Sequence, residues 1–246
     1  MIISPSIELQ NGRCVSLNRG RLDEPHIWHV DPLETAKKYA ASGAEWIHLT
    51  DFDAIAGDDC NTDLVQDIIQ HSGTSIQLGG GFRSLHGISE WIDRGAGRIV
   101  IGTLAVMAPN LVKQAAKLYP DQIVIAVDVF EGRLMSDGWR KPSAIDPETF
   151  IKTFAKDPLA AIIVTDIDAD IEETENSLAL VTKLADISTA PVHARGLSHS
   201  IDDIARLKYV PHVAGAIIGR ALFDHSVDLN DAIELANLPS QTAAFV

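Results

Sequence analysis

Short apolar runs rich in β-branched residues alternate along the chain with longer segments in which apolar positions recur at helical spacing. The apolar runs predict eight strands, at residues 2–8, 45–51, 74–79, 97–102, 122–128, 160–166, 190–194 and 214–219. The helical patterns that follow predict helices at residues 32–42, 62–72, 84–94, 108–118, 146–155, 175–186, 200–207 and 228–236. Residues that favour helix N-caps precede several of these segments, namely Asp31, Asn61, Ser84, Asp146 and Ser200.

Regular alternation of this kind predicts an α/β fold with parallel strands. Strands that are apolar on both faces are typical of a sheet covered by helices, and eight strand–helix units favour a closed (β/α)₈ TIM barrel. Such a barrel uses about 250 residues as one domain, and we expect residues 1–246 to form that single domain. An open doubly wound sheet is the weaker alternative, because it does not explain the internal repeat described next.

One unit of sequence appears twice, in residues 75–106 and 190–223. Each copy has an apolar strand, a glycine turn, a helix and a second apolar strand that ends in Ile-Gly. Gly80 and Gly102 are 22 positions apart, and Gly196 and Gly219 are 23 apart. Glycine between a strand and a helix lets backbone N–H groups point at an anion. The repeat predicts a half-barrel duplication with two phosphate sites, suited to a ligand with a phosphate at each end.

Composition excludes several classes of function. The net charge of −14 argues against nucleic acid as a partner. No apolar run of about 18 residues predicts a membrane span, and the start of the chain does not resemble a signal peptide. Cys14 and Cys60 show neither metal spacing nor a disulfide framework, and His193 and His199 are interpreted as core or turn residues rather than metal ligands. We expect a cytoplasmic protein without a metal.

Acidic residues end several predicted strands, where a barrel of this type builds its active site. Glu8 ends the first strand and Asp128 the fifth, so the two should face each other across the barrel mouth. One acid and one base in that arrangement suit chemistry on neighbouring atoms of a sugar. The residues themselves also allow other roles. An acidic strand end is often a helix cap, and Trp139 is either a loop anchor or a stacking platform.

Several motifs together carry a family resemblance over nearly the whole chain. They are PSIELQNGRCV, IHLTDFDAIAG, QLGGGFRS, IGTLAV, VDVFEGRLMSDGW, IIVTDIDAD and IIGRALF. These motifs resemble the family of the histidine-biosynthesis isomerase that acts on phosphoribosylformimino-AICAR-ribotide (ProFAR). Members are TIM barrels that convert an aminoaldose to an aminoketose by an Amadori rearrangement, without a cofactor.

The resemblance implies a role for each matching position. Glu8 matches the general base and Asp128 the general acid, while Thr165 and Asp170 match further catalytic positions. The implied phosphate-binding residues are Gly80, Gly81, Arg83, Gly102 and Thr103 at one end, and Gly196, Gly219 and Arg220 at the other. The implied substrate-binding residues are Arg19, His48, Asp51 and Trp139. The expected partner is a small bisphosphorylated sugar, bound by a monomer.

Some positions depart from the family pattern. Glu8 is one methylene longer than the usual Asp, and in the second glycine turn Arg195 and Leu197 stand where small residues are usual. Leu197 is expected to obstruct the approach of a phosphate to the backbone. Two alternatives to the isomerase therefore stay open. One is a diverged enzyme that acts on another phosphorylated sugar or metabolite, and the other is a non-catalytic barrel that binds a phosphorylated ligand.

Overall fold

Eight parallel strands form a closed ring in the computed structural model, which describes residues 1–18, 20–167 and 174–239. The ring strands, in chain order, are β1 (Ile2–Gln10), β4 (Trp46–Asp51), β5 (Ser75–Gly79), β6 (Arg98–Ile101), β7 (Ile123–Phe130), β10 (Ala161–Asp166), β11 (Val192–Arg195) and β12 (Val213–Ile218). Pairing of β12 with β1 and of β10 with β7 closes the ring. The predicted TIM barrel is confirmed, and each predicted strand lies within two residues of its observed bounds.

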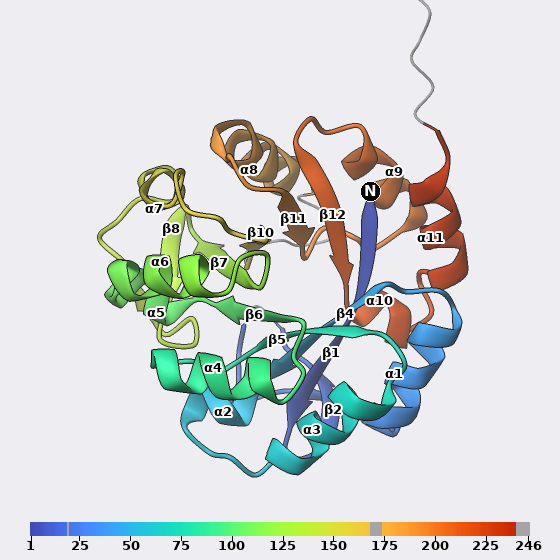
Figure 1. Cartoon of the computed structure of the whole chain (residues 1–246). Helices are drawn as coiled ribbons and strands as arrows, with labels where there is room; N and C mark the ends of the chain where they lie inside the picture. Colours follow the sequence, from blue (N-terminus) through green and yellow to red (C-terminus); the bar gives the residue numbers. More distant parts are fainter. Residues whose placement is uncertain (19, 168–173, 240–246) are drawn as a thin grey trace, which may run out of the picture.

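Helices surround the strand ring on the outside (Figure 1). The eight that match the predicted helices are α1 (Pro32–Ala41), α3 (Thr62–His71), α4 (Leu85–Asp93), α6 (Pro109–Leu118), α7 (Pro147–Thr153), α8 (Thr174–Ile187), α9 (Ile201–Lys208) and α11 (Leu229–Asn237). Alternate strand residues such as Ile7, Ile47 and Leu49 are fully buried in the apolar core that includes the inner helix faces. The residues between them face the barrel interior, so the strand ends carry side chains into its mouth.

Each half of the barrel begins with a hairpin that the sequence analysis did not predict. β1 continues into antiparallel β2 (Arg13–Ser16) and then β3 (His26–Trp28), while β7 continues into β8 (Arg133–Ser136) and β9 (Lys141–Pro142). Both turns have a residue pair with positive φ, Asn11-Gly12 at 50° and 70° and Glu131-Gly132 at 48° and 71°. Asn-Gly between apolar residues is a strong hairpin signal, so the first hairpin had a local cue.

The glycines of the two halves share their backbone conformation. Gly80 and Gly196 have φ of 116° and 86°. Gly102 (φ −100°, ψ −87°) and Gly219 (φ −109°, ψ −100°) precede the short helices α5 (Thr103–Met107) and α10 (Arg220–Phe223). These similar geometries, with the matching hairpins, agree with the predicted half-barrel duplication. The short helices, and α2 (Phe52–Ala56), were missed because four or five residues do not reveal a helical period.

Four of the five predicted N-caps are confirmed. The side chains of Asp31, Ser84, Asp146 and Ser200 accept hydrogen bonds from backbone N–H groups in the first turns of their helices. Asn61 does occupy the N-cap position of α3, but its side chain makes no cap hydrogen bond. It is buried and bonds instead to a pair of carboxylates and to the first hairpin turn.

Candidate functional site

Two adjoining pockets occupy the mouth of the barrel. The larger, of about 580 Å³, is lined by Asp128, and we name it the Asp128 pocket. The smaller, of about 280 Å³, is lined by Glu8 and is named the Glu8 pocket. Trp139 and Arg195 line both pockets and form the boundary between them.

Most of the predicted site residues line one of these pockets. The Asp128 pocket contains His48, Gly80, Gly81, Arg83, Gly102, Thr103, Asp128 and Trp139. The Glu8 pocket contains Glu8, Trp139, Thr165, Gly196, Gly219 and Arg220. Asp51 lines neither, and the predicted residues Arg19 and Asp170 lie outside the described residues.

Glu8 and Asp128 come from opposite sides of the ring, because β1 and β7 are four places apart in either direction. Each carboxylate has a different partner. Arg195 Nη2 donates to Glu8 Oε1, in an ion pair whose side chains are 16% and 14% exposed for Glu8 and Arg195. Trp139 Nε1 donates to Asp128 Oδ2 at 2.8 Å. One carboxylate is thus paired with a cation and the other with a neutral donor.

Four buried polar atoms of pocket-lining residues have no hydrogen-bond partner among the described residues. Ser6 Oγ and Ser198 Oγ line the Glu8 pocket, and the other two are Asp128 Oδ1 and Thr165 Oγ1. These last two residues are paired in register on the neighbouring strands β7 and β10, so the two side chains lie on the same face of the sheet. Buried polar atoms are nearly always hydrogen-bonded in native proteins, and unpaired ones at a pocket are suited to a ligand.

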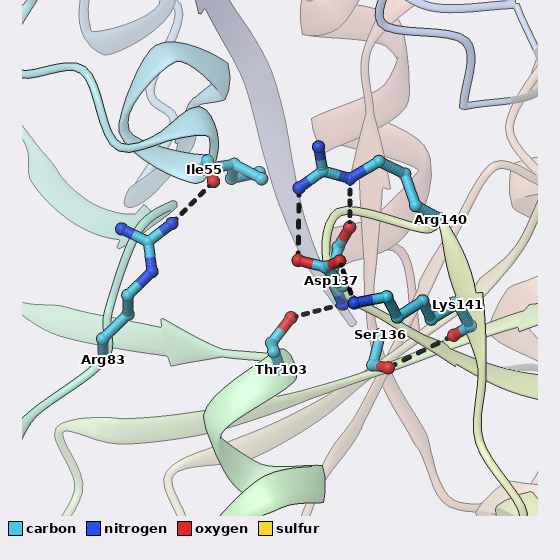
Figure 2. Close-up of polar contacts among 7 residues, drawn as sticks. All are labelled: Ile55, Arg83, Thr103, Ser136, Asp137, Arg140 and Lys141. Atoms are coloured by element: carbon cyan, nitrogen blue, oxygen red, sulfur yellow. Dashed lines mark hydrogen bonds and ion pairs between the residues drawn. The ribbon is translucent and has the colours of Figure 1, made fainter.

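The loop that carries Trp139 is held over the Asp128 pocket by polar contacts (Figure 2). Asp137 N donates to Thr103 Oγ1 at 2.8 Å, while Arg140 and Lys141 converge on the Asp137 carboxylate at 3.2 and 3.0 Å. The hydrogen bond from Lys141, with the positive charge of both neighbours, lowers the pKa of Asp137. Asp137, Gly138 and Trp139 all have positive φ, at 55°, 63° and 63°. Successive residues in this region indicate a backbone that its surroundings hold in place.

Trp139 also packs against the other half of the mouth. Its ring meets Phe52 edge to face, with centroids 5.7 Å apart. A Cβ placed on Gly20 would lie 3.2 Å from the Trp139 ring, so glycine there allows close approach. The tryptophan is therefore a loop anchor in this structure. Its position between the pockets leaves the predicted stacking role open.

The two predicted phosphate ends are built alike. Neither α5 nor α10 has a side-chain cap, which leaves N–H groups at their first turns without a side-chain acceptor. An arginine lies beside each end. Arg83 Nη2 donates to the Ile55 carbonyl at 2.8 Å (Figure 2), and Arg220 Nη2 donates to the Leu17 carbonyl at 3.2 Å. At its phosphate end, each pocket can thus offer backbone donors and a guanidinium to an anion, in addition to Arg195, which lines both pockets.

Comparison with known proteins agrees with this architecture. The family model described as "Histidine biosynthesis protein" matches residues 2–228. The chain is 58% identical over 236 residues to "1-(5-phosphoribosyl)-5-((5-phosphoribosylamino)methylideneamino) imidazole-4-carboxamide isomerase 2" of Ruegeria pomeroyi, with 96% of both chains covered. It is 51% identical over 247 residues to the protein of Ruegeria sp. strain TM1040 with that name and the numeral 1, with 100% of both covered. A Caulobacter sp. strain K31 isomerase of the same name is 40% identical, with 96% of this chain and 99% of the relative covered.

The compound in these names is ProFAR. The chain belongs to the ProFAR isomerase family. The resemblance in its motifs is therefore confirmed over most of the chain, and the alternatives of a diverged enzyme and a non-catalytic barrel are not favoured.

Asp51, expected to contact substrate in a ProFAR isomerase, has a structural position in this family member. Its Oδ1 accepts hydrogen bonds from Asp53 N, Ala54 N and Asn61 Nδ2, and so caps α2. Burial raises the pKa of the Asp51 carboxyl, and the hydrogen bonds from Asn61 and the backbone oppose that rise. The Asp51 side chain thus supports the floor under the Gly80 turn, where the Asp51 carbonyl lies 2.3 Å from the position of a Gly80 Cβ.

His48 is buried at the base of the Asp128 pocket. Its ring nitrogens lie 3.1 Å from Thr50 Oγ1 and 3.0 Å from Gln77 Nε2. Burial lowers the pKa of His48 well below its ordinary value, and the positive charge of Arg195 adds to the effect. The imidazole is therefore neutral near pH 7, able to donate or accept a hydrogen bond but not to act as a cation.

The second glycine turn differs from expectation. The Leu197 side chain is 1% exposed, belongs to the apolar core and does not line the Glu8 pocket, so the predicted obstruction by this side chain is not found. Arg195 lies in the mouth instead. The sequence analysis noted Arg195 as a departure but did not pair it with Glu8. It also missed Asp137, for which the SDGW turn was the local signal.

Within the described parts of the chain, no group of three or more His, Cys, Asp or Glu residues has the arrangement of a metal site. The same residues include no helix that is long and apolar enough to cross a membrane.

Proposed function

We propose that the protein converts ProFAR from an aminoaldose to an aminoketose by an Amadori rearrangement. The observation that carries the proposal is the pair of carboxylates, Glu8 and Asp128, on opposite strands of one mouth. Each lies in a pocket with an uncapped helix start and an arginine. This arrangement suits a molecule with a phosphate at each end and its reacting part in the middle. The full-length identity to proteins named as isomerases supports the same reaction.

In the proposed reaction Asp128 acts as the acid and Glu8 as the base. Asp128 donates a proton to the ribose ring oxygen, and the bond from that oxygen to C1 breaks to give a protonated imine. Glu8 then removes the proton from C2, and the electrons of that bond form an enolamine. Loss of the hydroxyl proton from the enolamine and protonation of C1 give the aminoketose, with no net gain or loss of atoms.

The environments of the two carboxylates support this division of roles. Glu8 accepts a hydrogen bond from a guanidinium, and a carboxylate paired with a cation is suited to the role of base. Asp128 has the neutral indole of Trp139 on one oxygen and no described partner on the buried other oxygen, where a transferable proton would sit. Thr165, beside Asp128 in register, offers a hydroxyl to the sugar.

We further propose that residues 1–246 act as one barrel domain and as a monomer, because one chain supplies both carboxylates and both pockets. Membership of a family of biosynthetic isomerases supports the proposal of a cytoplasmic enzyme. The bound phosphates would rest on the backbone N–H groups of the Gly80-Gly81 and Gly102-Thr103 turns at one end, and on Gly196 and Gly219-Arg220 at the other. Backbone donors explain how a chain with a net charge of −14 holds an anion.

Substitution of each carboxylate by its amide tests the reaction. Glu8→Gln and Asp128→Asn should each lower kcat by about 100- to 10,000-fold with KM little changed, because the amide keeps the shape but does not transfer the proton. Steady-state turnover of ProFAR measures this. Glu90→Gln, an exposed carboxylate on α4 paired with Arg94, is the matched control and should match wild type. A wild-type protein without turnover of ProFAR, or amide variants with wild-type kcat, would overturn the proposal.

A further inference from the structure

Arg195 is the charged side chain that both pockets share. Arg83 lines only the Asp128 pocket, and Arg220 lines only the Glu8 pocket. A ligand that places its two phosphates near Arg83 and Arg220 must pass Arg195 with its middle portion. The position of Arg195 therefore corresponds to the part of the ligand that reacts, rather than to either phosphate.

The route of the Arg195 side chain across the mouth is open for a structural reason. Arg195 ends β11, and Glu8 lies on β1, with β12 between them in the ring. β12 ends at Ile218 and is followed by Gly219, which has no side chain to block the space above Ser6 of β1. The guanidinium thus contacts Glu8 from two strands away, although the two residues are 187 positions apart in sequence.

Stability alone is a weak reason for such a pair. Both side chains are at least 84% buried, since their exposed fractions are 14% and 16%. Burial removes hydration from both charges, and the attraction between them roughly offsets that loss, so buried ion pairs contribute little net stability. A long, flexible glutamate in a reaction pocket does gain one thing from the contact, which is a fixed orientation of its carboxylate.

We propose that Arg195 is a positioning residue that orients the Glu8 carboxylate for proton removal, an inference that rests on the proposed isomerase function. The guanidinium engages Oε1 of Glu8. Within residues 1–18, 20–167 and 174–239, Oε2 has no hydrogen-bond partner, which leaves this oxygen available to accept the proton. In the proposed complex the remaining N–H groups of Arg195 would contact the middle of the ligand, so that one planar guanidinium would hold both substrate and base.

Substitution of Arg195 tests the inference by a split between kcat and KM. Arg195→Met keeps the apolar part of the side chain and removes the guanidinium. It should lower kcat by about 100-fold, the loss expected when a reacting group is misplaced by about 1 Å, with a smaller change in KM. Arg195→Lys should recover part of the loss, because it restores one charge but not the planar fork. Arg94→Met, an exposed arginine paired with Glu90, is the matched control and should not change kcat.

A double-mutant cycle with Glu8→Asp separates positioning from a general structural effect. The shorter carboxylate moves away from Arg195, so Arg195→Met should cost much less in the Glu8→Asp background than in wild type. The isotope effect on kcat with ProFAR deuterated at C2 should also rise in Arg195→Met, because misalignment slows proton removal specifically. An altered fold without a positioning effect would not raise it.

The outcomes distinguish this inference from the proposed function. Wild-type protein that does not turn over ProFAR overturns both. Active wild type with a fully additive cycle, an unchanged isotope effect, or a loss in Arg195→Met confined to KM overturns the positioning role alone and leaves the isomerase in place.

Discussion

At the scale of single residues, the two glycines that begin the duplicated turns are under unequal constraint. A Cβ on Gly80 would lie 2.3 Å from the Asp51 carbonyl oxygen, whereas a Cβ on Gly196 would lie 3.3 Å from the Asp166 carbonyl oxygen. Both have positive φ. The first contact is closer than real atoms approach, and backbone on both sides prevents relief. The second requires a shift of only a few tenths of an ångström.

We therefore expect Gly80→Ala to destabilise the protein more than Gly196→Ala. Gly132→Ala isolates the effect of φ, because Gly132 has φ of 71° and no atom within 4 Å of its Cβ position. That control should cost about 1 kcal/mol, or about 2–4 °C in Tm for a chain of this size. Thermal unfolding followed by circular dichroism measures all three. Equal Tm losses at Gly80 and Gly196 would show that the Asp51 contact is relieved by movement.

The buried histidines predict acid sensitivity. Burial, with the nearby charge of Arg98, lowers the pKa of His193 from 6.5 to about 4. The unfolded chain therefore binds a proton between these pH values that the folded chain does not, and stability is lost as pH falls through this window. His193 alone contributes up to about 3 kcal/mol of that loss, and buried His48 acts in the same direction. The pKa of Asp51 is raised, so the contribution of Asp51 to stability changes with pH in the opposite direction.

His193→Gln should flatten this pH dependence. Urea unfolding of wild type and variant at pH 7 and pH 4.5 gives the difference in slope, even if the variant is less stable at both pH values. His86→Gln, at an exposed histidine, is the control and should keep the wild-type slope. A variant at His193 with the full wild-type acid sensitivity would show that the loss has another origin.

At the scale of elements, the first hairpin is tied to the next strand–helix unit through Asn61. Its Nδ2 donates to Asp51 Oδ1 at 2.8 Å and to Asp53 Oδ2 at 2.7 Å, and its Oδ1 accepts from Gly12 N at 2.9 Å. One buried amide thus joins two carboxylates and the β1–β2 turn. The network uses both the N–H donors of the Asn61 amide, which bond the carboxylates, and its oxygen, which accepts from Gly12 N.

Asn61→Asp should be strongly destabilising at pH 7, although the two side chains have nearly the same shape. It replaces the shared donor with a third buried carboxylate, and a buried charge left without a partner costs about 3–5 kcal/mol. Acidic pH should relieve part of the loss, because protonation removes the repulsion. Chemical unfolding at pH 7 and pH 5 checks this. Asn110→Asp makes the same change at an exposed position on α6 and should have little effect.

The secondary-structure elements differ in how well the sequence predicts them. Strands and long helices were predictable because their apolar periods are local and extend over many residues. The predicted capping hydrogen bond of Asn61 is absent because its side chain bonds to Asp51 and Asp53 instead. Residue type alone does not reveal such partners from elsewhere in the fold. The second hairpin lacked the local cue of the first, since Glu131-Gly132 replaces Asn-Gly at the turn.

At the scale of the whole molecule, the site depends on contacts that no local pattern contains. The ring order places Glu8 opposite Asp128, and that was predictable once a barrel was assumed. The Glu8–Arg195 pair and the bond from Asp137 to Thr103 were not, because they join residues that come together only when the barrel closes. Most of the site residues predicted from the motifs line the two pockets, but the motifs did not indicate that Trp139 and Arg195 divide the mouth in two.

That division predicts that the two phosphate ends act independently. Arg83→Gln and Arg220→Gln each remove one guanidinium from a different pocket, at a proposed phosphate end. Each should raise KM by about 10-fold with kcat little changed, because a contact to a part of the substrate that does not react supports binding equally before and during the reaction. The double variant should raise KM by about 100-fold, since separated sites are additive.

Arg94→Gln serves as the exposed control. Steady-state kinetics with ProFAR and competitive inhibition by inorganic phosphate measure both ends. If Arg83→Gln abolished the effect of Arg220→Gln, the two pockets would be one coupled site, and the pseudo-twofold arrangement of the barrel would not extend to its ligand.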